Sequence, residues 1–126
     1  MRLYLFPVVF FIVLLGLGVT VLVALGNSAQ DVIRDFDQIR DAIRNEDWKL
    51  AEDRIAAAHT AWDKHRQWWA VVIDHREIDN IEMSFSKVGE YIRYQDKAMA
   101  SAELTVLKRL IEHIPEKEKV SLKNIL

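Results

Sequence analysis

The stretch that decides the fold is 48–72, which reads WKLAEDRIAAAHTAWDKHRQWWAVV. A mostly apolar stripe recurs along it in alternating steps of three and four residues, at Trp48, Ala51, Ile55, Ala58, Trp62, His65, Trp69 and Val72. Positions three and four apart share one face of an α-helix, so the stripe predicts a long amphipathic helix over 47–74. Asp47 is the expected N-cap of that helix.

The same helical spacing continues on both sides of this stretch. Upstream, Ser28 and Asp31 resemble a capping arrangement at the start of a helix over 29–45, which is predicted by apolar residues at Val32, Phe36, Ile39 and Ile43. Downstream, two further apolar stripes predict helices over 77–94 and 96–114. The first stripe comprises Ile78, Ile81, Phe85, Val88 and Ile92, and the second comprises Ala100, Leu104, Leu107, Ile111 and Ile114. Pro115 is expected to end the last helix, because proline cannot donate the next backbone hydrogen bond. A short C-terminal segment, 119–126, is expected to fold back on the other helices.

The two halves of this region repeat each other at an offset of 49 residues. Under that offset Phe36 falls on Phe85, and the predicted cap Asp47 falls on Asp96. Short connections make neighbouring helices antiparallel. The sequence therefore predicts an all-α fold, in which an N-terminal transmembrane helix precedes an antiparallel four-helix bundle made of two similar αα-hairpins. Two stacked tetratricopeptide-like hairpins are the alternative, although two units are fewer than such arrays usually need.

The N-terminus is one long apolar block. No charged side chain occurs from Leu3 to Gln30, and residues 3–25 would reach roughly 35 Å as a helix, enough to cross a hydrocarbon core of about 30 Å. The expected division is a transmembrane anchor, 1–26, that contacts membrane lipid through residues 3–25, followed by a helical domain, 27–126. A cleaved signal peptide is the alternative, with Ala24-Leu25-Gly26 as its cleavage site.

Charge and cysteine content restrict the environment and the partners. Arg2 precedes the span and Asp31 is the first charge after it, so the positive-inside rule predicts a cytoplasmic N-terminus and an extracytoplasmic domain. The domain carries 19 acidic side chains and all of the 17 basic ones except Arg2, a balance that gives no support for nucleic-acid binding. The chain has no cysteine, so no disulfide crosslinks it.

The motifs of catalytic and metal-binding proteins are missing from the sequence. None of the four histidines, His59, His65, His75 and His113, follows a glutamate at the three-residue spacing of di-iron bundles. The zinc-protease pattern, paired cysteines, a P-loop and a glycine-rich dinucleotide turn are absent too. We therefore expect no catalytic residue, no metal and no cofactor.

Six residues are candidate contacts for a partner or ligand. Trp62 and Trp69 fit the apolar stripe, and core positions are the simpler explanation for them. Trp68 lies just off the stripe and is the better candidate for a partner or membrane-interface contact. His65 lies within the stripe, either as a hydrogen-bonded core histidine or as a pH-responsive group. His75 and Glu77 belong to a polar cluster at a predicted turn, where a solvated turn is a simpler interpretation than a bound cation.

Several short motifs occur together in a recognisable order. They are Trp48 with Ala51, the tryptophan-rich segment 62–69, His75-Arg76-Glu77-Ile78, and Ser121-Leu122-Lys123-Asn124-Ile125. In this order they resemble a family of short, N-terminally membrane-anchored helical proteins from endospore-forming and related Gram-positive bacteria, catalogued as a domain of unknown function. The resemblance implies an anchored helical domain in a Gram-positive envelope, and it supplies no catalytic or binding residue.

Three functions remain open from the sequence. The first is a non-catalytic interaction subunit that binds another membrane or envelope protein, with self-association into a homo-oligomer as a variant. The second is an extracytoplasmic bundle that senses a ligand or pH. The third is a secreted soluble helical protein, released after signal cleavage.

Overall fold

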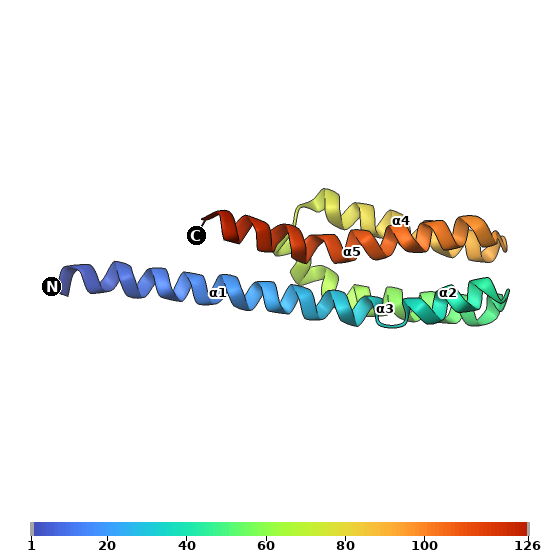
Figure 1. Cartoon of the computed structure of the whole chain (residues 1–126), viewed down its shortest axis with the longest axis horizontal. Helices are drawn as coiled ribbons and strands as arrows, with labels where there is room; N and C mark the ends of the chain where they lie inside the picture. Colours follow the sequence, from blue (N-terminus) through green and yellow to red (C-terminus); the bar gives the residue numbers. More distant parts are fainter. Residues whose placement is uncertain (1, 126) are drawn as a thin grey trace.

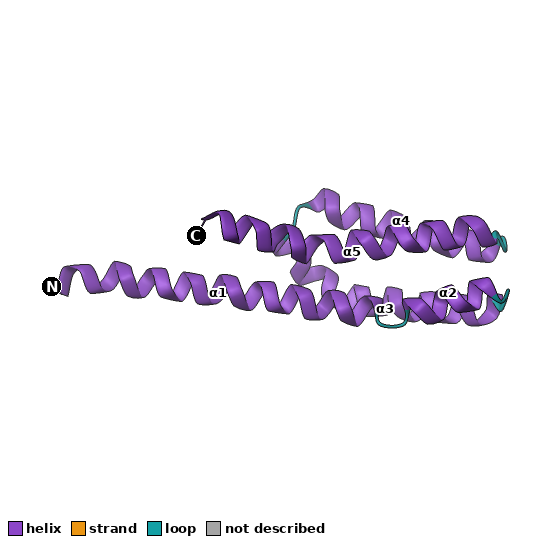
Figure 2. Cartoon of the chain, in the orientation of Figure 1, coloured by secondary structure: helices purple, strands orange, loops and turns teal. Residues whose placement is uncertain are grey.

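The structure is a computed structural model that describes residues 2–125, with Ile125 described by its backbone alone. The described chain is all helical and contains no strand (Figure 2). Its helices are α1 (Arg2–Ile33), α2 (Phe36–Arg44), α3 (Trp48–Val72), α4 (His75–Arg93) and α5 (Lys97–Ile125).

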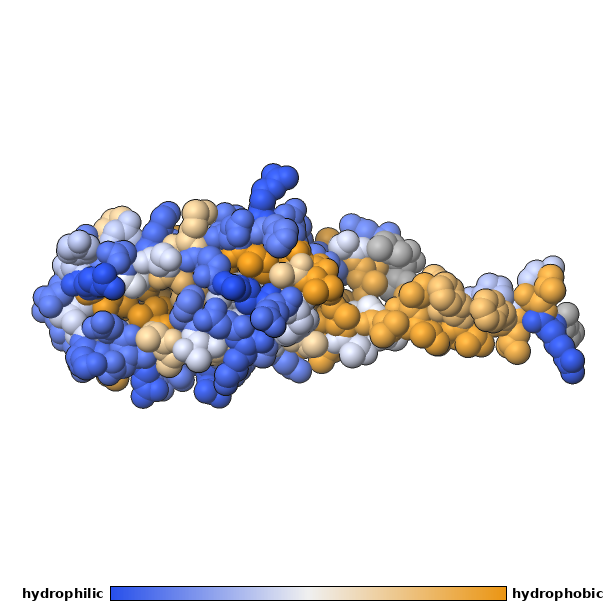
Figure 3. Space-filling model, turned by 180° about the vertical axis from the view of Figure 1, so that it is seen from behind, coloured by the Kyte–Doolittle hydropathy of each residue, from blue (hydrophilic) through white to orange (hydrophobic). Residues whose placement is uncertain are grey.

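The helices pack side by side along one long axis (Figure 1). α1 and α2 follow one another in the same direction, α3 runs back along them, and α4 and α5 form a second layer. α3 contacts α1, α2 and α4, while α5 contacts α1, α2 and α4. The first half of α1 projects beyond the other helices, where Figure 3 shows it as an apolar stalk on a largely polar body. The N-terminal helix as a whole is long and apolar enough to cross a membrane.

The predicted apolar stripes form one buried core. The positions expected to face inward from the helices flanking α3 are all buried: Val32, Phe36, Ile39, Ile43, Ile78, Ile81, Phe85, Val88, Ile92, Ala100, Leu104, Leu107, Ile111 and Ile114. Within α3 itself, Trp62 and Trp69 are completely buried. His65 and Trp48 are only half-buried, and Val72 at the end of the helix is 40% exposed, so the predicted stripe is only partly buried.

The expected helix over 29–45 does not begin at Ser28. α1 continues without interruption to Ile33, and the break comes at Arg34 and Asp35. The Ser28 hydroxyl donates backwards to the carbonyl of Leu25 (2.9 Å), as a serine within a helix does, so it caps no new helix. α1 continues because Leu25, Ala29 and Val32 form a single buried stripe across the expected boundary.

Pro115 does not end the last helix. α5 runs through it to Ile125, so residues 119–125 extend α5 and do not fold back as a separate segment, while Leu126 lies outside the described residues. Proline cannot donate to the preceding turn, so the helix continues with one backbone hydrogen bond fewer. The Glu and Lys residues that follow are good helix formers, and Leu122 packs 3.4 Å from the position of a Cβ on Gly18 of α1.

The turns before α3 and α5 have the same backbone structure. In the first, the Asp47 amide donates to the Ala42 carbonyl (2.8 Å) and the Glu46 amide to the Ile43 carbonyl (3.1 Å). In the second, the Asp96 amide donates to the Tyr91 carbonyl (2.9 Å) and the Gln95 amide to the Ile92 carbonyl (3.0 Å). This is the Schellman pattern of a helix end. Asp47 and Asp96 then cap the following helices by accepting from the amides of Leu50 and Met99.

Both turns hold a non-glycine residue in the left-handed region, Glu46 at φ 58° and Gln95 at φ 57°. A side chain costs about 1–2 kcal/mol in that conformation, whereas glycine enters it freely but loses more entropy on folding. Glu46→Gly is therefore expected to stabilise the protein by about 0.5–1 kcal/mol, measured by chemical denaturation. Glu46→Ala removes the same carboxylate and keeps the strain, so a stabilisation by alanine would contradict this explanation.

Candidate functional site

Two buried tryptophans of α3 form the centre of the core. Trp62 and Trp69 meet edge to face, with ring centroids 5.3 Å apart. The indole nitrogen of Trp69 donates to the Ser28 hydroxyl (2.8 Å), which in turn donates to the Leu25 carbonyl (2.9 Å). Buried polar groups cost little when they are hydrogen-bonded. The chain of bonds therefore attaches α3 to the part of α1 that follows the apolar stalk.

Glu82 of α4 collects three donors from α3. Its Oε1 accepts from the Trp62 indole (2.6 Å) and from Nη1 of Arg66 (3.0 Å), and its Oε2 lies 3.4 Å from Nε2 of His59. His59 also lies 3.7 Å from Asp63, and its ring meets Phe85 edge to face. This cluster joins α3 to α4.

The donors around Glu82 outweigh its partial burial. Burial alone raises the pKa of this carboxyl, but the hydrogen bonds from Trp62, Arg66 and His59 hold the pKa below its ordinary value of 4.5. A carboxylate whose pKa falls on folding stabilises the folded state above its unfolded pKa. That stabilisation is lost as the pH falls through the lowered folded pKa.

Glu82→Gln is expected to lower the free energy of unfolding at pH 7. The loss should become progressively smaller as the pH falls from 5 to 3, because the wild-type carboxylate is then protonated as well. The amide oxygen can still accept from Trp62, but the ion pair with Arg66 is lost. Urea unfolding of the full-length protein in detergent, followed by tryptophan fluorescence, measures the difference. Glu90→Gln is the control, because the Glu90 carboxylate forms an exposed pair with Arg93, and an exposed pair contributes little to stability. A cost for Glu82→Gln that is equal at pH 7 and pH 3 would contradict the assigned role.

His65 lies at the edge of the core. Its Nε2 is 2.9 Å from Oδ2 of Asp31 on α1, and the side chain is 24% exposed. The hydrogen bond with His65 is the largest influence on the pKa of Asp31. Together with the nearby charge of Arg34, it outweighs the effect of burial and lowers that pKa. The expected core histidine is therefore a half-buried partner that links α3 to α1 beside the Trp69–Ser28 bond.

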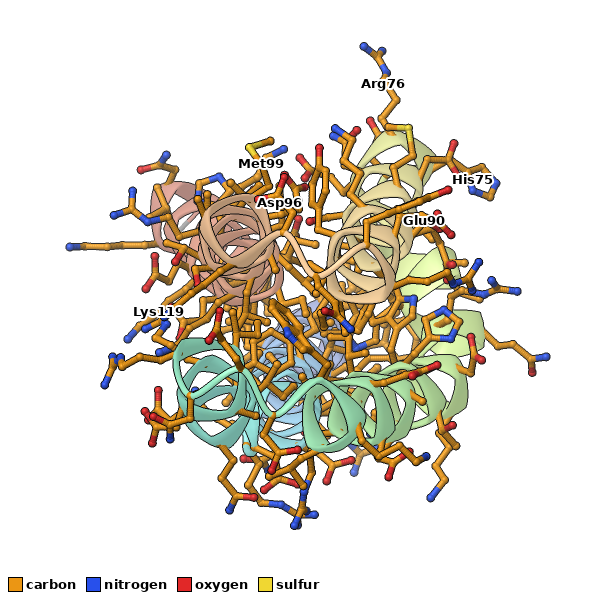
Figure 4. All side chains as sticks on the ribbon, turned by 90° about the vertical axis from the view of Figure 1, so that its right-hand side faces the viewer. His75, Arg76, Glu90, Asp96, Met99 and Lys119 are labelled. Atoms are coloured by element: carbon orange, nitrogen blue, oxygen red, sulfur yellow. The ribbon has the colours of Figure 1, made fainter. Side chains whose placement is uncertain are left out.

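The remaining predicted contacts lie at the same end of the bundle but do not form one site. Trp68 is half-buried against Trp69, with ring centroids 6.2 Å apart. His75 is exposed and points away from the bundle, as does its neighbour Arg76 (Figure 4). Glu77 accepts from Nζ of Lys117 (3.2 Å) and thereby ties the start of α4 to α5.

Three side chains offer ligand atoms to a cation. One atom each from His59, Asp63 and Glu82 lies within 4.8 Å of the others. A divalent ion bound there would compete with Arg66 and Trp62, which already bond to Glu82. The cluster is complete as a set of ion pairs, and joining α3 to α4 is sufficient to explain it.

An apolar groove of about 610 Å³ lies between α1 and the end of α5. Its apolar lining comprises Val19, Leu22, Val23 and Gly26 of α1 with Pro115 and Leu122 of α5. Lys119 and Lys123 lie along its α5 side, and Figure 4 shows Lys119 reaching outward from the bundle. The groove extends along α1 from Val19 to Gly26, where the end of α5 lies beside the apolar stretch.

The sequence did not identify Ser28, Asp31 and Glu82 as the hydrogen-bond partners of α3 side chains. It also did not identify the residues of α5 that line the groove. One signal was present, because a tryptophan in a core stripe needs an acceptor for its indole N–H. Trp62 and Trp69 therefore each required a polar partner, but their partners lie 20 and 41 residues away in sequence. Periodicity within one helix cannot identify such partners.

Comparison with known proteins gives one family match. A family described as a domain of unknown function (DUF4363) matches residues 19–125. No curated protein and no solved structure matches the chain. The matched range begins at Val19, within the apolar stretch and next to the Gly18–Leu122 contact of α1 with α5. Because the match covers well over half of the chain, the protein belongs to the DUF4363 family of domains of unknown function.

Proposed function

We propose that the protein is a non-catalytic interaction subunit, held in the cell membrane by α1, that presents its helical bundle to another membrane or envelope protein. The observation that carries the proposal is the continuity of α1 from Arg2 to Ile33. Its first half is exposed and apolar, whereas Leu25, Ser28, Ala29 and Val32 are buried in the bundle. The anchor and the domain therefore share one helix, with no linker between them.

Because the anchor and the bundle share one helix, the orientation of the bundle relative to the membrane is fixed. Domains joined by flexible linkers sample many orientations, whereas a continuous helix transmits position and rotation directly. The Trp69–Ser28 and His65–Asp31 bonds join α3 to this helix just beyond the stalk. A rigid connection of this kind suits a subunit whose bundle must contact a membrane partner at a fixed distance from the membrane and in a fixed orientation.

We also infer that the helices form an antiparallel four-helix bundle made of two hairpins. In the first hairpin α1 and α2 together pair with α3, and in the second α4 pairs with α5. The matching Schellman turns at Glu46 and Gln95, 49 residues apart, support two similar hairpins. The proposed division into an anchor, 1–26, and a domain, 27–126, follows the hydropathy of the sequence, although α1 crosses that boundary as one helix.

Orientation and setting are inferred from the flanking charge and the family resemblance. Arg2 favours a cytoplasmic N-terminus and an extracytoplasmic bundle. From the resemblance to Gram-positive proteins we infer that the bundle lies in the envelope of such a cell. Val71 is 84% exposed beside the half-buried Trp68, so the end of α3 is the surface we assign to a partner.

The test is crosslinking of the full-length protein in native membranes, with a photoreactive residue at position 71 and mass spectrometry of the products. The matched control carries the same group at Met83, which is 56% exposed on α4. A single membrane or envelope protein crosslinked from position 71 and not from 83 is the expected result. Crosslinks only to the chain itself would replace the partner with a homo-oligomer, and no specific product from either position would overturn the proposal.

The His65–Asp31 bond favours a second candidate function, a pH-sensing bundle. Histidine is the side chain whose ordinary pKa falls between pH 5 and 8, and this one bridges α3 to the anchor helix. Tryptophan fluorescence of the folded protein, titrated over that range, should then change in the wild type and not in His65→Gln. A flat wild-type titration would exclude the pH switch.

Cleavage after Gly26 would instead release a secreted protein. N-terminal sequencing of the mature chain distinguishes the two forms. The burial of Leu25 supports the uncleaved anchor, because cleavage would remove that side chain from the core.

A further inference from the structure

We propose that the groove between α1 and the end of α5 binds an anionic phospholipid, with an acyl chain on the apolar lining and the phosphate on Lys119 and Lys123. The inference rests on the membrane anchoring proposed above and adds a specific ligand class to it. It concerns a surface distinct from the end of α3 assigned to a protein partner.

The groove lies at the boundary between the lipid headgroups and the hydrocarbon core. α5 runs antiparallel to α1, and its Leu122 reaches the level of Gly18. The helix from Leu3 to Gly18 rises roughly 22 Å, which is less than a hydrocarbon core of about 30 Å. The last turns of α5 therefore enter the headgroup layer and the outer part of the hydrocarbon.

The lysines of this segment are suited to that depth. Lys119 and Lys123 are four residues apart, so their side chains share one face of α5. Neither forms an ion pair with any described residue, whereas Lys117 bonds to Glu77. Long basic side chains near a membrane extend their charge to the interface and cover apolar surface with their stems. Glu116 also lines the groove, but it lies a turn further from the anchor.

The groove opens onto the lipid-facing surface of the anchor helix. Val19 and Val23 line it and are 51% and 57% exposed. Its volume of about 610 Å³ lies within the usual range of small-molecule sites. An acyl chain can enter sideways from the bilayer, while a soluble ligand would have to pass the headgroups. An apolar surface beside two ammonium groups that pair with no described residue matches an anionic lipid.

Native mass spectrometry of the full-length protein in detergent, with added phosphatidylglycerol or phosphatidylcholine, tests the proposal. The charge variant is Lys119→Gln/Lys123→Gln, and its matched control is Lys87→Gln/Lys97→Gln, which removes two exposed lysines outside the groove. The groove-filling variant is Gly26→Leu, because a Cβ at Gly26 meets nothing within 4 Å. Its control is Gly16→Leu, which is equally open and lies outside the groove.

Wild-type protein should retain phosphatidylglycerol in preference to phosphatidylcholine. The charge variant should bind it about 30-fold more weakly, from roughly 1 kcal/mol per lysine near the surface and 1.4 kcal/mol per tenfold change. Gly26→Leu should also reduce retention, and both control variants should match the wild type. Equal retention of the two lipids by the wild type, or unchanged retention in both groove variants, would overturn the proposal, as would competition by inorganic phosphate alone.

Carbonate extraction of native membranes separates this proposal from the anchoring on which it rests. Release of the wild type into the soluble fraction would refute the anchor itself. Protein that stays in the membrane but shows no lipid preference would refute only the lipid site.

Discussion

Trp69→Ala is expected to lower the free energy of unfolding by about 3–5 kcal/mol. Domains of this size are stable by only about 5–15 kcal/mol, so the variant should lose a large part of its stability. Trp69 is completely buried and lies at the contact of α3 with α1. The substitution therefore removes a large buried apolar surface together with a hydrogen bond between two helices.

Both losses contribute to the expected effect. Removal of the indole leaves a cavity beside Trp62, whose ring meets Trp69 at 5.3 Å. It also removes the donor to Ser28, which is 4% exposed. The Ser28 hydroxyl still donates to the Leu25 carbonyl, so the serine keeps one partner and the cavity accounts for most of the lost stability.

The adjacent residue supplies the control. Trp68→Ala removes the same side chain from a half-buried position and should cost about 1–2 kcal/mol. Chemical denaturation of both full-length variants in the same detergent measures the difference. Equal losses for Trp68→Ala and Trp69→Ala would mean that the burial assigned to α3 is wrong by about one residue in rotation.

The helices and most of the core could be predicted because their signals are local. The stripes in α4 and α5 each lie within one helix, and every predicted position in them is buried. The capping aspartates Asp47 and Asp96 could also be predicted, since a cap bonds to an amide three residues ahead. These features depend on residues that are close in sequence.

The features missed from sequence depend on contacts between distant segments. Ser28 and Asp31 together resembled a cap, but they bond to Trp69 and His65 of α3. Pro115 is a helix breaker by local rules, yet α5 continues past it and packs Leu122 against Gly18. In both cases tertiary packing decides where a helix ends, and periodicity carries no information about the packed neighbour.

Leu25→Ala gives the second large effect and bears directly on the anchor. Leu25 is 1% exposed although it lies inside the apolar stretch that hydropathy assigns to the membrane. Its replacement is expected to cost about 2–5 kcal/mol, the usual range for a leucine buried in a protein core. Replacing a leucine that faced only lipid would lower the free energy of unfolding far less, because lipid can fill the space that alanine leaves.

Leu17→Ala is the matched control on the same helix, since Leu17 is 58% exposed on the stalk. Both variants are measured by denaturation of the full-length protein in one detergent, where micelle contacts are shared. A large loss for Leu25→Ala beside a small one for Leu17→Ala would show that the bundle uses the end of the apolar stretch, at residue 25, as core. Equal, small losses would mean that the bundle folds without residue 25, and the secreted form cut after Gly26 would then become the better explanation of the chain.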